Sequence, residues 1–290
     1  DGAYLARLLL ERGYEVHGTS RDAEVRGFGN LVRLEIADRV HKTSMAINDF
    51  RSVLQVISRV NPDEIYSLAG QSSVGLSFEQ PVETLESISL GTLNLLEALR
   101  FLGRPIRLYS AGSSECFGDT GTGRAAEGTP FRPRSPYAVA KATAHWLVAN
   151  YREAYGLHAS TGILFNHESP LRSRRFVTRK IVAAACAIAG GSTERLELGN
   201  VQIHRDWGWA PEYVEAMWLM LQQPRADDYV IATGQAHSLA QFAAAAFAHF
   251  GLDWQQFTDI SPALFRPADI AFSCGDAGKA GQVLGWRARF

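Results

Sequence analysis

The sequence predicts an α/β protein with a doubly wound parallel sheet and a smaller, interleaved α/β lobe. Three observations favour this fold: short apolar strands alternate with amphipathic helices up to about residue 168, polar clusters follow successive strands, and the alternation loosens further on. Such alternation is typical of right-handed βαβ units, whose parallel strands end at one edge of the sheet. Ligands bind beyond that edge, where Gly70-Gln71, residues 113–115 and Asn166-His167 are expected.

The elements of the first half follow from apolar spacing and from stop signals such as Gly13 and Asn61-Pro62. Helices are expected from the start of the chain to Gly13 and over 50–60, 83–103 and 136–155. Strands are expected over 14–20, 64–70, 106–112 and 159–166. In the second half we expect helices over 176–191, 210–224 and 238–251 and a strand over 228–234, with Ser238 as a helix N-cap.

The bulk composition excludes some classes of function. The chain has 290 residues and a net charge of −1 without a basic block, which argues against nucleic-acid binding. No apolar run reaches the length of a membrane span. Cys116, Cys186 and Cys274 form no CxxC pair, which is typical of a reduced cytoplasmic protein. The histidines show no ligand-like spacing, so we expect no metal site.

Tyr137 and Lys141 lie four residues apart in the helix expected over 136–155, so they share one helical face. A nearby ammonium favours the phenolate, so Lys141 is expected to lower the pKa of Tyr137 and make it a general base toward a sugar or alcohol hydroxyl. The alternative is a solvated surface pair. Pro136 in the first turn and the polar residues ending the preceding strand favour the catalytic interpretation.

The segment SAGSSECFG forms a second candidate cluster. The hydroxyls of Ser113 and Ser114 are able to bond the substrate oxygen that the tyrosine deprotonates. Glu115 is the more informative residue, because a simple alcohol dehydrogenase needs no carboxylate here, whereas removal of a carbon-bound proton beside a ketone needs a base. The alternative is a turn in which the serines cap backbone groups.

Longer motifs carry a family resemblance. They are DGAYLARLLLERGYEVHG, SSECFG, PRSPYAVAK, REAYG, GILFNHESPLR, FVTRKI, RDWGWAPEYVEAMWLMLQ, VIATG and RPADI. Together they resemble the GDP-mannose 4,6-dehydratases of the extended short-chain dehydrogenase/reductase superfamily over nearly the whole chain, least at 22–48 and 252–264. An NADP-binding Rossmann-like domain is then expected over 1–168 and about 203–235, with a nucleotide-sugar-binding lobe over 169–202 and 236–290.

The resemblance also implies roles in an internal redox reaction. Tyr137 would take the proton of the C4 hydroxyl of GDP-mannose as hydride passes to NADP, and Lys141 would hold the nicotinamide ribose. Glu115 would remove the C5 proton as the C6 hydroxyl leaves as water, before hydride returns to C6. Ser113 stands where the family carries a catalytic threonine. The product would be GDP-4-keto-6-deoxymannose, a precursor of GDP-fucose or GDP-rhamnose, so the net reaction is that of a lyase.

The resemblance implies a set of cofactor contacts. Only Asp1 and Gly2 of the family's glycine-rich turn are present, so we expect that residues are missing there and also after Phe290. Arg21 follows the strand expected over 14–20, which corresponds to the family's second strand. A basic side chain there meets a 2′-phosphate and favours NADP, although Asp22 replaces a second arginine of the family. Ala46 and Glu83 also depart from the family pattern. The other expected contacts are Leu68, Ala69, Gly70, Gln71, Ser72, Lys141, His167 and Arg172.

The substrate contacts follow by the same matching. Arginine suits a diphosphate because its guanidinium pairs with two oxygens. The alternative for Arg205 and Arg266 is that both are ordinary surface charges. Trp207 and Trp209 are expected to pack rather than to contact substrate. The expected substrate-binding residues are Ser114, Asn166, Val177, Lys180, Arg205, Arg266 and Asp269.

Two other functions remain open at this point. One is a nucleotide-sugar 4-reductase or epimerase. Neither enzyme has to remove a C5 proton, so neither would need Glu115 as a base. The other is an NADP(H)-sensing scaffold without turnover, against which the intact catalytic set argues. As partners we expect GDP-mannose and further copies of the chain, as a dimer or tetramer, with the loop after Arg21 reaching a neighbour's cofactor. We expect no nucleic-acid or membrane partner.

Overall fold

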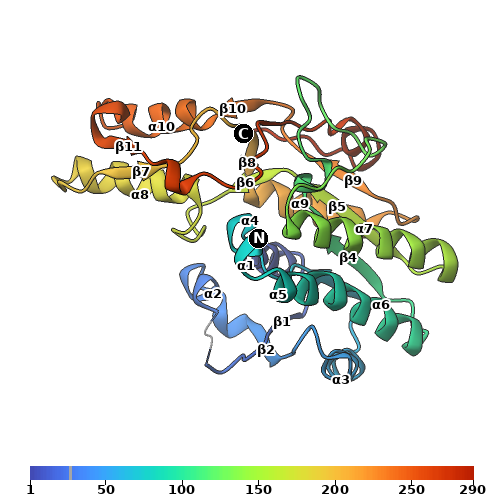
Figure 1. The fold of residues 1–290 in the computed structure, drawn as a ribbon. Coiled ribbons are helices and arrows are strands. Elements are labelled where there is room, and N and C mark those ends of the chain that lie inside the picture. The colour runs from blue at the N-terminus through green and yellow to red at the C-terminus, as the bar shows by residue number, and fades with distance from the viewer. Residues whose placement is uncertain (26–27) are drawn as a thin grey trace.

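The computed structural model describes residues 1–25 and 28–290, and Figure 1 shows its elements arranged in a larger and a smaller α/β group. The larger group contains a four-stranded parallel sheet in the order β3-β4-β5-β9 and a parallel pair, β1 and β2. The bounds of these strands are β1 Val16–Ser20, β2 Val40–Ser44, β3 Glu64–Ser67, β4 Arg107–Ala111, β5 Ala159–Leu164 and β9 Tyr229–Ile231. Every residue of β5 is buried, as expected for a central strand.

Helices cover both faces of the four-stranded sheet. Successive side chains of a strand point to opposite faces, and in β4 Leu108 joins a core formed with α3, α6 and α7, whereas Tyr109 joins one formed with α1 and α9. The second core also includes Val16 of β1 and Val40 of β2, so it joins the two sheets. The bounds are α1 Gly2–Glu11, α2 Gly29–Arg33, α3 Phe50–Val60, α4 Val74–Glu79, α5 Pro81–Leu85, α6 Gly91–Leu102, α7 Pro136–Tyr155 and α9 Ala210–Gln222. The predicted doubly wound class is confirmed.

The helix boundaries have local causes. Asp49 accepts a hydrogen bond from the Arg51 N–H at the start of α3, and Asn61 ends that helix in the left-handed conformation, with φ 51°. Ser135 caps α7 in the same way, Pro136 occupies its first turn, and Gly156 ends it. The helix expected over 83–103 is present as α5 and α6 joined by a π-helical segment, Glu86–Leu90.

The smaller group is built around β8, which pairs with β6, β10 and β12, and around the parallel pair β7 and β11. Their bounds are β6 Asn166–Glu168, β7 Leu196–Leu198, β8 His204–Trp209, β10 Ala236–Ser238, β11 Thr258–Ile260 and β12 Phe272–Ser273. Helices α8 (Val177–Ala189) and α10 (Leu239–Ala248) pack on them in a separate core. Although β8 falls within the range predicted for the cofactor domain, it pairs with these strands. The division into two domains stays a prediction.

Asp206 of β8 connects this strand to two neighbouring loops. Its carboxylate is fully buried and accepts hydrogen bonds from the backbone of Thr233, Gly234 and Gly275, at 2.9, 2.9 and 3.2 Å. The Thr233 hydroxyl adds a bond of 2.7 Å. A buried carboxylate held by several N–H donors fixes the segments that supply them. Across the described residues, no helix is long and apolar enough to span a membrane.

Candidate active site

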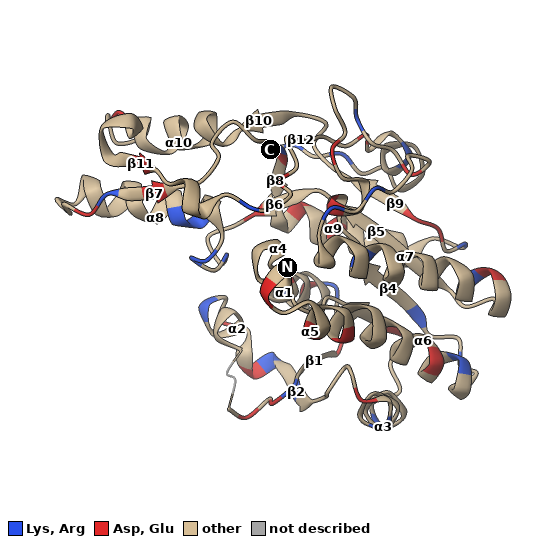
Figure 2. Cartoon of the chain, viewed as in Figure 1, with Lys and Arg blue, Asp and Glu red and all other residues tan. Residues whose placement is uncertain are grey.

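A cleft of about 410 Å³ lies between the two groups of elements. It is lined by residues that follow β4, β5 and β6 and by residues of α7, α8 and β8. Figure 2 shows basic residues on α8 and on the loop before it, on the side toward α1 and α4. All four predicted catalytic residues line the cleft: Ser113, Glu115, Tyr137 and Lys141. Many of the predicted binding residues line it too: Asp1, Leu68, Ser72, Ser114, Asn166, His167, Arg172, Val177, Lys180, Arg205, Arg266 and Asp269.

The end of β4 places Ser113 and Glu115. The Ser113 hydroxyl accepts a hydrogen bond of 3.3 Å from the Glu115 N–H and begins a 3-10 turn over Ser114–Phe117. Gly112 is required before this turn, because a Cβ there would lie 2.9 Å from the Gly162 carbonyl oxygen of β5. The alternative proposed from the sequence, a serine that caps the backbone, is therefore present. It leaves Ser113 in the cleft wall beside Tyr137.

The Glu115 side chain is half-buried among charges. Burial raises its pKa above the ordinary value, the nearby Arg205 and Arg266 act in the opposite direction, and Asp269 raises it again. A raised pKa makes a carboxylate a stronger base once it is ionised, and the two guanidinium groups keep the ionised form accessible. This environment suits proton transfer at carbon better than a structural ion pair.

Tyr137 departs from the sequence-based prediction. Its pKa is raised, not lowered, because burial disfavours the phenolate, and the Ser113 hydroxyl offsets only part of that effect. Lys141 lies on the same side, with its Nζ 5.9 Å from the Tyr137 ring centre. That ammonium donates a hydrogen bond of 2.7 Å to the Ala111 carbonyl. Burial lowers the pKa of Lys141 to about 8, so the lysine is itself a perturbed group.

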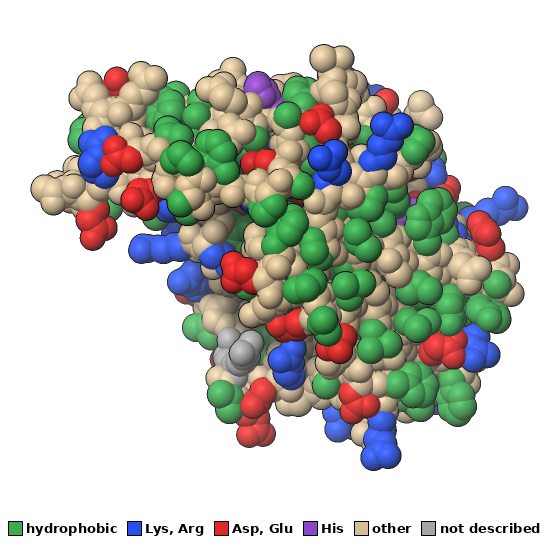
Figure 3. Space-filling model, viewed as in Figure 1, with side chains coloured by type: hydrophobic (Ala, Val, Ile, Leu, Met, Phe, Trp, Pro, Cys, Tyr) green, Lys and Arg blue, Asp and Glu red, His purple; other side chains and the backbone are tan. Residues whose placement is uncertain are grey.

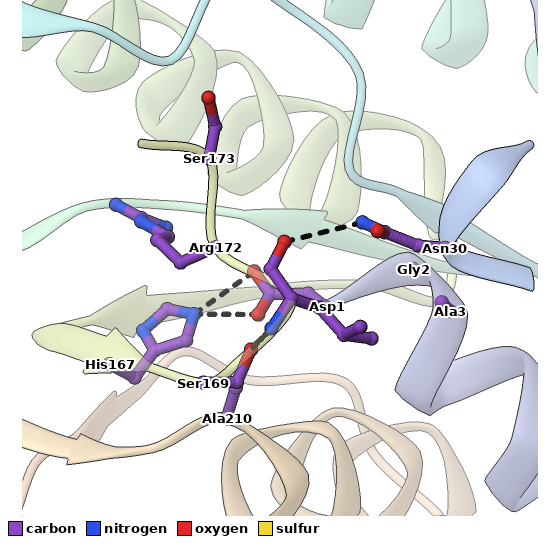
Figure 4. A pocket seen from close by; sticks show the side chains of 10 residues that line it. Asp1, Gly2, Ala3, Asn30, His167, Ser169, Arg172, Ser173 and Ala210 are labelled. Carbon is purple, nitrogen blue, oxygen red and sulfur yellow. Dashed lines mark hydrogen bonds and ion pairs between the residues drawn. The ribbon is translucent and has the colours of Figure 1, made fainter. Parts of the chain in front are cut away.

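A second, smaller cavity of about 140 Å³ lies at the N-terminus of α1 and shares Asp1, His167 and Arg172 with the cleft. Gly2 also lines it. Figure 4 shows the His167 ring directed at the Asp1 carboxylate, and its Nε2 lies 3.0 and 2.9 Å from the two oxygens. The other ring nitrogen lies 2.7 Å from the Phe165 carbonyl, and the ring stacks on Tyr213 at 4.4 Å. Burial lowers the pKa of His167 to about 4.

The loop after β3 forms a rigid turn. Gly70 has φ +118°, and a Cβ there would lie 2.8 Å from Ile88 Cγ1. Gln71 donates from its side chain to the Ser73 carbonyl at 2.8 Å and to the Thr84 hydroxyl at 3.2 Å. Of the predicted loop residues, Leu68 and Ser72 line the cleft, whereas Ala69, Gly70 and Gln71 do not. In the structure the Gln71 side chain stabilises the turn through these two hydrogen bonds.

Arg21 lies apart from both cavities, at the carboxyl end of β1. Its guanidinium is 3.8 Å from the Glu83 carboxylate, and both side chains are at least half exposed. The carboxylate of Asp22, which replaces the family's second arginine, bonds to its own loop. It accepts hydrogen bonds of 3.1 Å from the N–H groups of Glu24 and Val25. The loop predicted to reach a neighbour includes residues 26–27, which lie outside the described residues.

Arg205 is not a surface charge. The residue is 4% exposed, and its guanidinium donates to the carbonyls of Ile270 and His204 at 2.7 and 2.9 Å. Asp269 lies 3.4 Å from Arg205 and 3.9 Å from the more exposed Arg266. Lys180 donates to the Glu197 carbonyl at 2.6 Å. The cleft wall therefore carries cations that the fold already positions.

Some cleft residues were not predicted from the sequence. Glu168 is the most distinctive, because burial raises the pKa of its carboxyl while Arg172, 3.4 Å away, and Thr178 act in the opposite direction. The position of Glu168 directly after His167 could have signalled it, since it lies at the same strand end. Trp207, expected only to pack, both packs against Phe242 at 5.3 Å and lines the cleft.

Comparison with known proteins decides the family. The sequence profile described as GDP-mannose 4,6 dehydratase matches residues 1–290. The chain belongs to the GDP-mannose 4,6-dehydratase family. It is 47% identical to GDP-mannose 4,6 dehydratase 1 of Arabidopsis thaliana, covering 99% of this chain and 82% of that protein. It is 46% identical to GDP-mannose 4,6-dehydratase of Sinorhizobium fredii, covering 99% and 89%. The family resemblance predicted from the motifs is confirmed.

Solved structures agree on the fold of this dehydratase-family chain. UDP-glucose 4-epimerase of Thermus thermophilus, in complex with NAD, superimposes with a TM-score of 0.84 at 28% identity, over 99% of this chain and 90% of that one. dTDP-glucose 4,6-dehydratase of Streptomyces venezuelae, with NAD and TYD bound, gives 0.88 at 22% identity, over 100% and 89%. At 22% identity the second likeness shows the fold alone.

Proposed function

We propose that this chain converts GDP-mannose to GDP-4-keto-6-deoxymannose, with NADP as a cofactor that is regenerated in each turnover. The observation that supports this proposal most is that Glu115, a half-buried carboxylate with a raised pKa, shares one cleft with Ser113, Tyr137 and Lys141. The family's named activity, the 4,6-dehydratase reaction, needs such a second base. A 4-reductase or a 4-epimerase does not, and no observation on the cleft favours either.

The residues present suit a dinucleotide cofactor. The N-terminus of the ten-residue helix α1 opens onto a cavity that Arg172 also lines, and this combination favours a phosphate anion. Arg21 supports NADP over NAD, because its contact with Glu83 is long and exposed and is therefore readily exchanged for a 2′-phosphate. Asp22 does not oppose this assignment, since its carboxylate is occupied by its own turn.

Each catalytic residue then has one task. When bound, NADP supplies the hydride acceptor for C4 and the hydride donor for C6. Tyr137 takes the proton of the C4 hydroxyl in its ionised form, which its raised pKa makes rare in the unliganded protein, and Ser113 holds the same oxygen in line. Glu115 takes the C5 proton, which the C4 ketone acidifies, and passes it to the C6 hydroxyl, which departs as water. Lys141, fixed by the Ala111 carbonyl, orients the nicotinamide ribose.

On the substrate side, Arg205 and Arg266 are assigned to the diphosphate and Lys180 to the nucleotide. Asn166, Ser114 and Val177 border the sugar, and Asp269 holds the two arginines in place. The three unbridged cysteines, Cys116, Cys186 and Cys274, support a reducing, cytoplasmic location.

A second copy of the chain is the proposed partner. Exposed apolar side chains gather on α5, on the π-helical segment and on α7, which packs on both: Val82, Leu85, Leu90, Val139 and Trp146. Figure 3 shows hydrophobic side chains spread over this face of the molecule. A two-fold axis across the face would set α5 and α7 against their own copies, as in an isologous dimer.

The deciding experiment uses the variant Glu115→Gln, which keeps the shape of the side chain and removes the base. With GDP-mannose and no added reductant, the parent is expected to form the 4-keto-6-deoxy product and to exchange the C5 hydrogen in D2O. The variant should still oxidise C4, seen as the near-ultraviolet absorbance of the reduced nicotinamide, and should lose product formation by about 100-fold or more.

The matched control is Glu194→Gln, an exposed carboxamide variant outside the cleft, which should behave as the parent. Full C5 exchange in Glu115→Gln would assign the base elsewhere. Formation of the C4 epimer by the parent would make the chain an epimerase instead.

A further inference from the structure

A cluster of two histidines and one glutamate lies away from the catalytic cleft. His17 and His41 are the second residues of β1 and β2 and lie opposite each other in the parallel register. Glu15 directly precedes β1. These residues sit at the amino ends of the two strands, whereas Arg21 follows the carboxyl end of β1. Figure 1 shows the β1–β2 pair at the margin of the molecule, apart from α8 and β8.

The ligand atoms of this cluster converge. Glu15 Oε1 lies 3.2 Å from His17 Nε2 and 3.3 Å from His41 Nε2. The two imidazole rings stack with their centres 4.7 Å apart and an angle of 23° between their planes. All three ligand atoms lie within 4.8 Å of one another, and no other such group of three occurs among the described residues.

These separations match those around a tetrahedral metal ion. Zinc binds histidine nitrogen and carboxylate oxygen at about 2.0–2.2 Å, which places neighbouring ligand atoms of a tetrahedron about 3.3–3.6 Å apart. The two measured separations are within about 0.1 Å of that range. The donor atoms would therefore move little on binding an ion, although the stacked rings would have to turn so that both Nε2 lone pairs point at it.

Simple ion pairing explains the arrangement less well. Side-chain exposures of 28% for His17, 61% for His41 and 71% for Glu15 mean that bonds to water compete with any bond inside the cluster. Exposed pairs of this kind contribute little to stability. Two imidazoles directed at one carboxylate oxygen nevertheless provide the donor set of a three-ligand site with an open fourth position for water.

We propose that Glu15, His17 and His41 form a binding site for a divalent transition-metal ion of the zinc class. Two imidazole ligands favour zinc, cobalt, nickel or copper over magnesium and calcium, which take oxygen ligands. The bound ion would cross-link β1 to β2 at the edge opposite the nucleotide cleft. Its role is structural, because the ion would stabilise the strand pair that carries Arg21 and would touch no reacting atom.

The experiment measures zinc binding to protein that carries no histidine tag, by titration calorimetry and by the visible absorption of tetrahedral cobalt. One zinc per chain is expected, with an affinity that falls at least tenfold in His17→Ala and in His41→Ala. Zinc should also raise the melting temperature of the parent and not that of His41→Ala. Magnesium at the same concentrations should give no comparable heat.

His249→Ala is the matched control, because it removes an exposed histidine from a different part of the surface. It should bind zinc as the parent does. Undiminished binding in both cluster variants, or no binding to the parent, would overturn the proposal. So would half a zinc per chain, which would mean that the ion joins two copies. None of these measurements uses substrate, so their outcome is independent of the proposed dehydratase reaction.

Discussion

At the scale of single residues, Lys141 shows the cost of placing an ammonium in the interior. The pKa of its side chain is lowered from 10.5 to about 8 by burial, and its hydrogen bond to Ala111 restores only part of the lost hydration. The native state therefore binds this proton less tightly than the unfolded chain does. Below pH 8 the destabilising effect is fully present, and it fades as the pH rises toward 10.5.

The variant Lys141→Met tests this consequence, since it keeps the length of the side chain without the charge. Relative to the variant, the free energy of unfolding of the parent should increase by about 2 kcal/mol between pH 8 and about pH 10. Urea unfolding at each pH gives the measurement. Dehydratase turnover should be strongly reduced in the variant throughout. If the two stability curves stay parallel, Lys141 has an ordinary pKa.

The candidate site was largely predictable residue by residue, but the protonation of its groups was not. The spacing of Tyr137 and Lys141 correctly indicated that both lie on one face and reach one cleft. It could not show that burial raises the Tyr137 pKa, because desolvation depends on all the segments that surround the hydroxyl. The raised pKa of Glu168 was hidden from the sequence for the same reason, since its burial depends on how distant segments close over the cleft.

At the scale of elements, α10 begins with a reciprocal pair of hydrogen bonds. Ser238 Oγ accepts from the Gln241 N–H at 3.1 Å, and Gln241 Oε1 accepts from the Ser238 N–H at 2.8 Å. Together they satisfy two backbone donors that the helix start would leave open. The same serine ends β10, so the cap also fixes where strand gives way to helix.

Replacement of the cap should destabilise the protein by a modest, defined amount. Ser238→Ala is expected to lower the free energy of unfolding by about 1 kcal/mol, measured by thermal or urea unfolding. Gln241→Ala should lower the free energy of unfolding by less than Ser238→Ala does. The double variant should lose less than the sum of the two single losses, because each single change already breaks the reciprocal pair. Additive losses would mean that the two bonds act independently.

Among the elements, the helices were easier to predict than the strands of the smaller group. α3, α7 and α9 carry long apolar stripes with clear start or stop signals. β7, β10 and β11 have three residues each, which is too short to show an alternating pattern. Their existence depends on partners distant in sequence, as in the pairing of β7 with β11.

At the scale of the whole molecule, the alternation of strands and helices was sufficient to predict the doubly wound sheet, because right-handed βαβ connections leave few topologies open. It could not predict that β8 pairs with β6, β10 and β12 while α9, directly after it, packs on the main sheet. The apolar face formed by α5, the π-helical segment and α7 was equally hidden, since its residues look like core positions in the sequence.

The proposed dimer gives a prediction at this scale. Val139 is 43% exposed on the apolar face, and Val139→Glu should place a charge in the proposed interface. Light scattering coupled to gel filtration should then show half the mass found for the parent. Val283→Glu, at a similarly exposed valine outside this face, should leave the mass unchanged. Equal masses for the parent and Val139→Glu would place the interface elsewhere.

The enclosure of Arg205 has a consequence for how the protein responds to its solvent. Dissolved ions weaken the attraction between exposed charges beyond about 10 Å at 0.1 M salt, but they reach an enclosed cation poorly. If Arg205 binds the diphosphate as proposed, its guanidinium, which is enclosed and hydrogen-bonded to two carbonyls, should therefore keep its attraction for that ligand as ionic strength changes. On the same proposal, an exposed cation such as Arg266 would attract the ligand from a distance in a salt-dependent way, whereas Arg205 would hold it once bound.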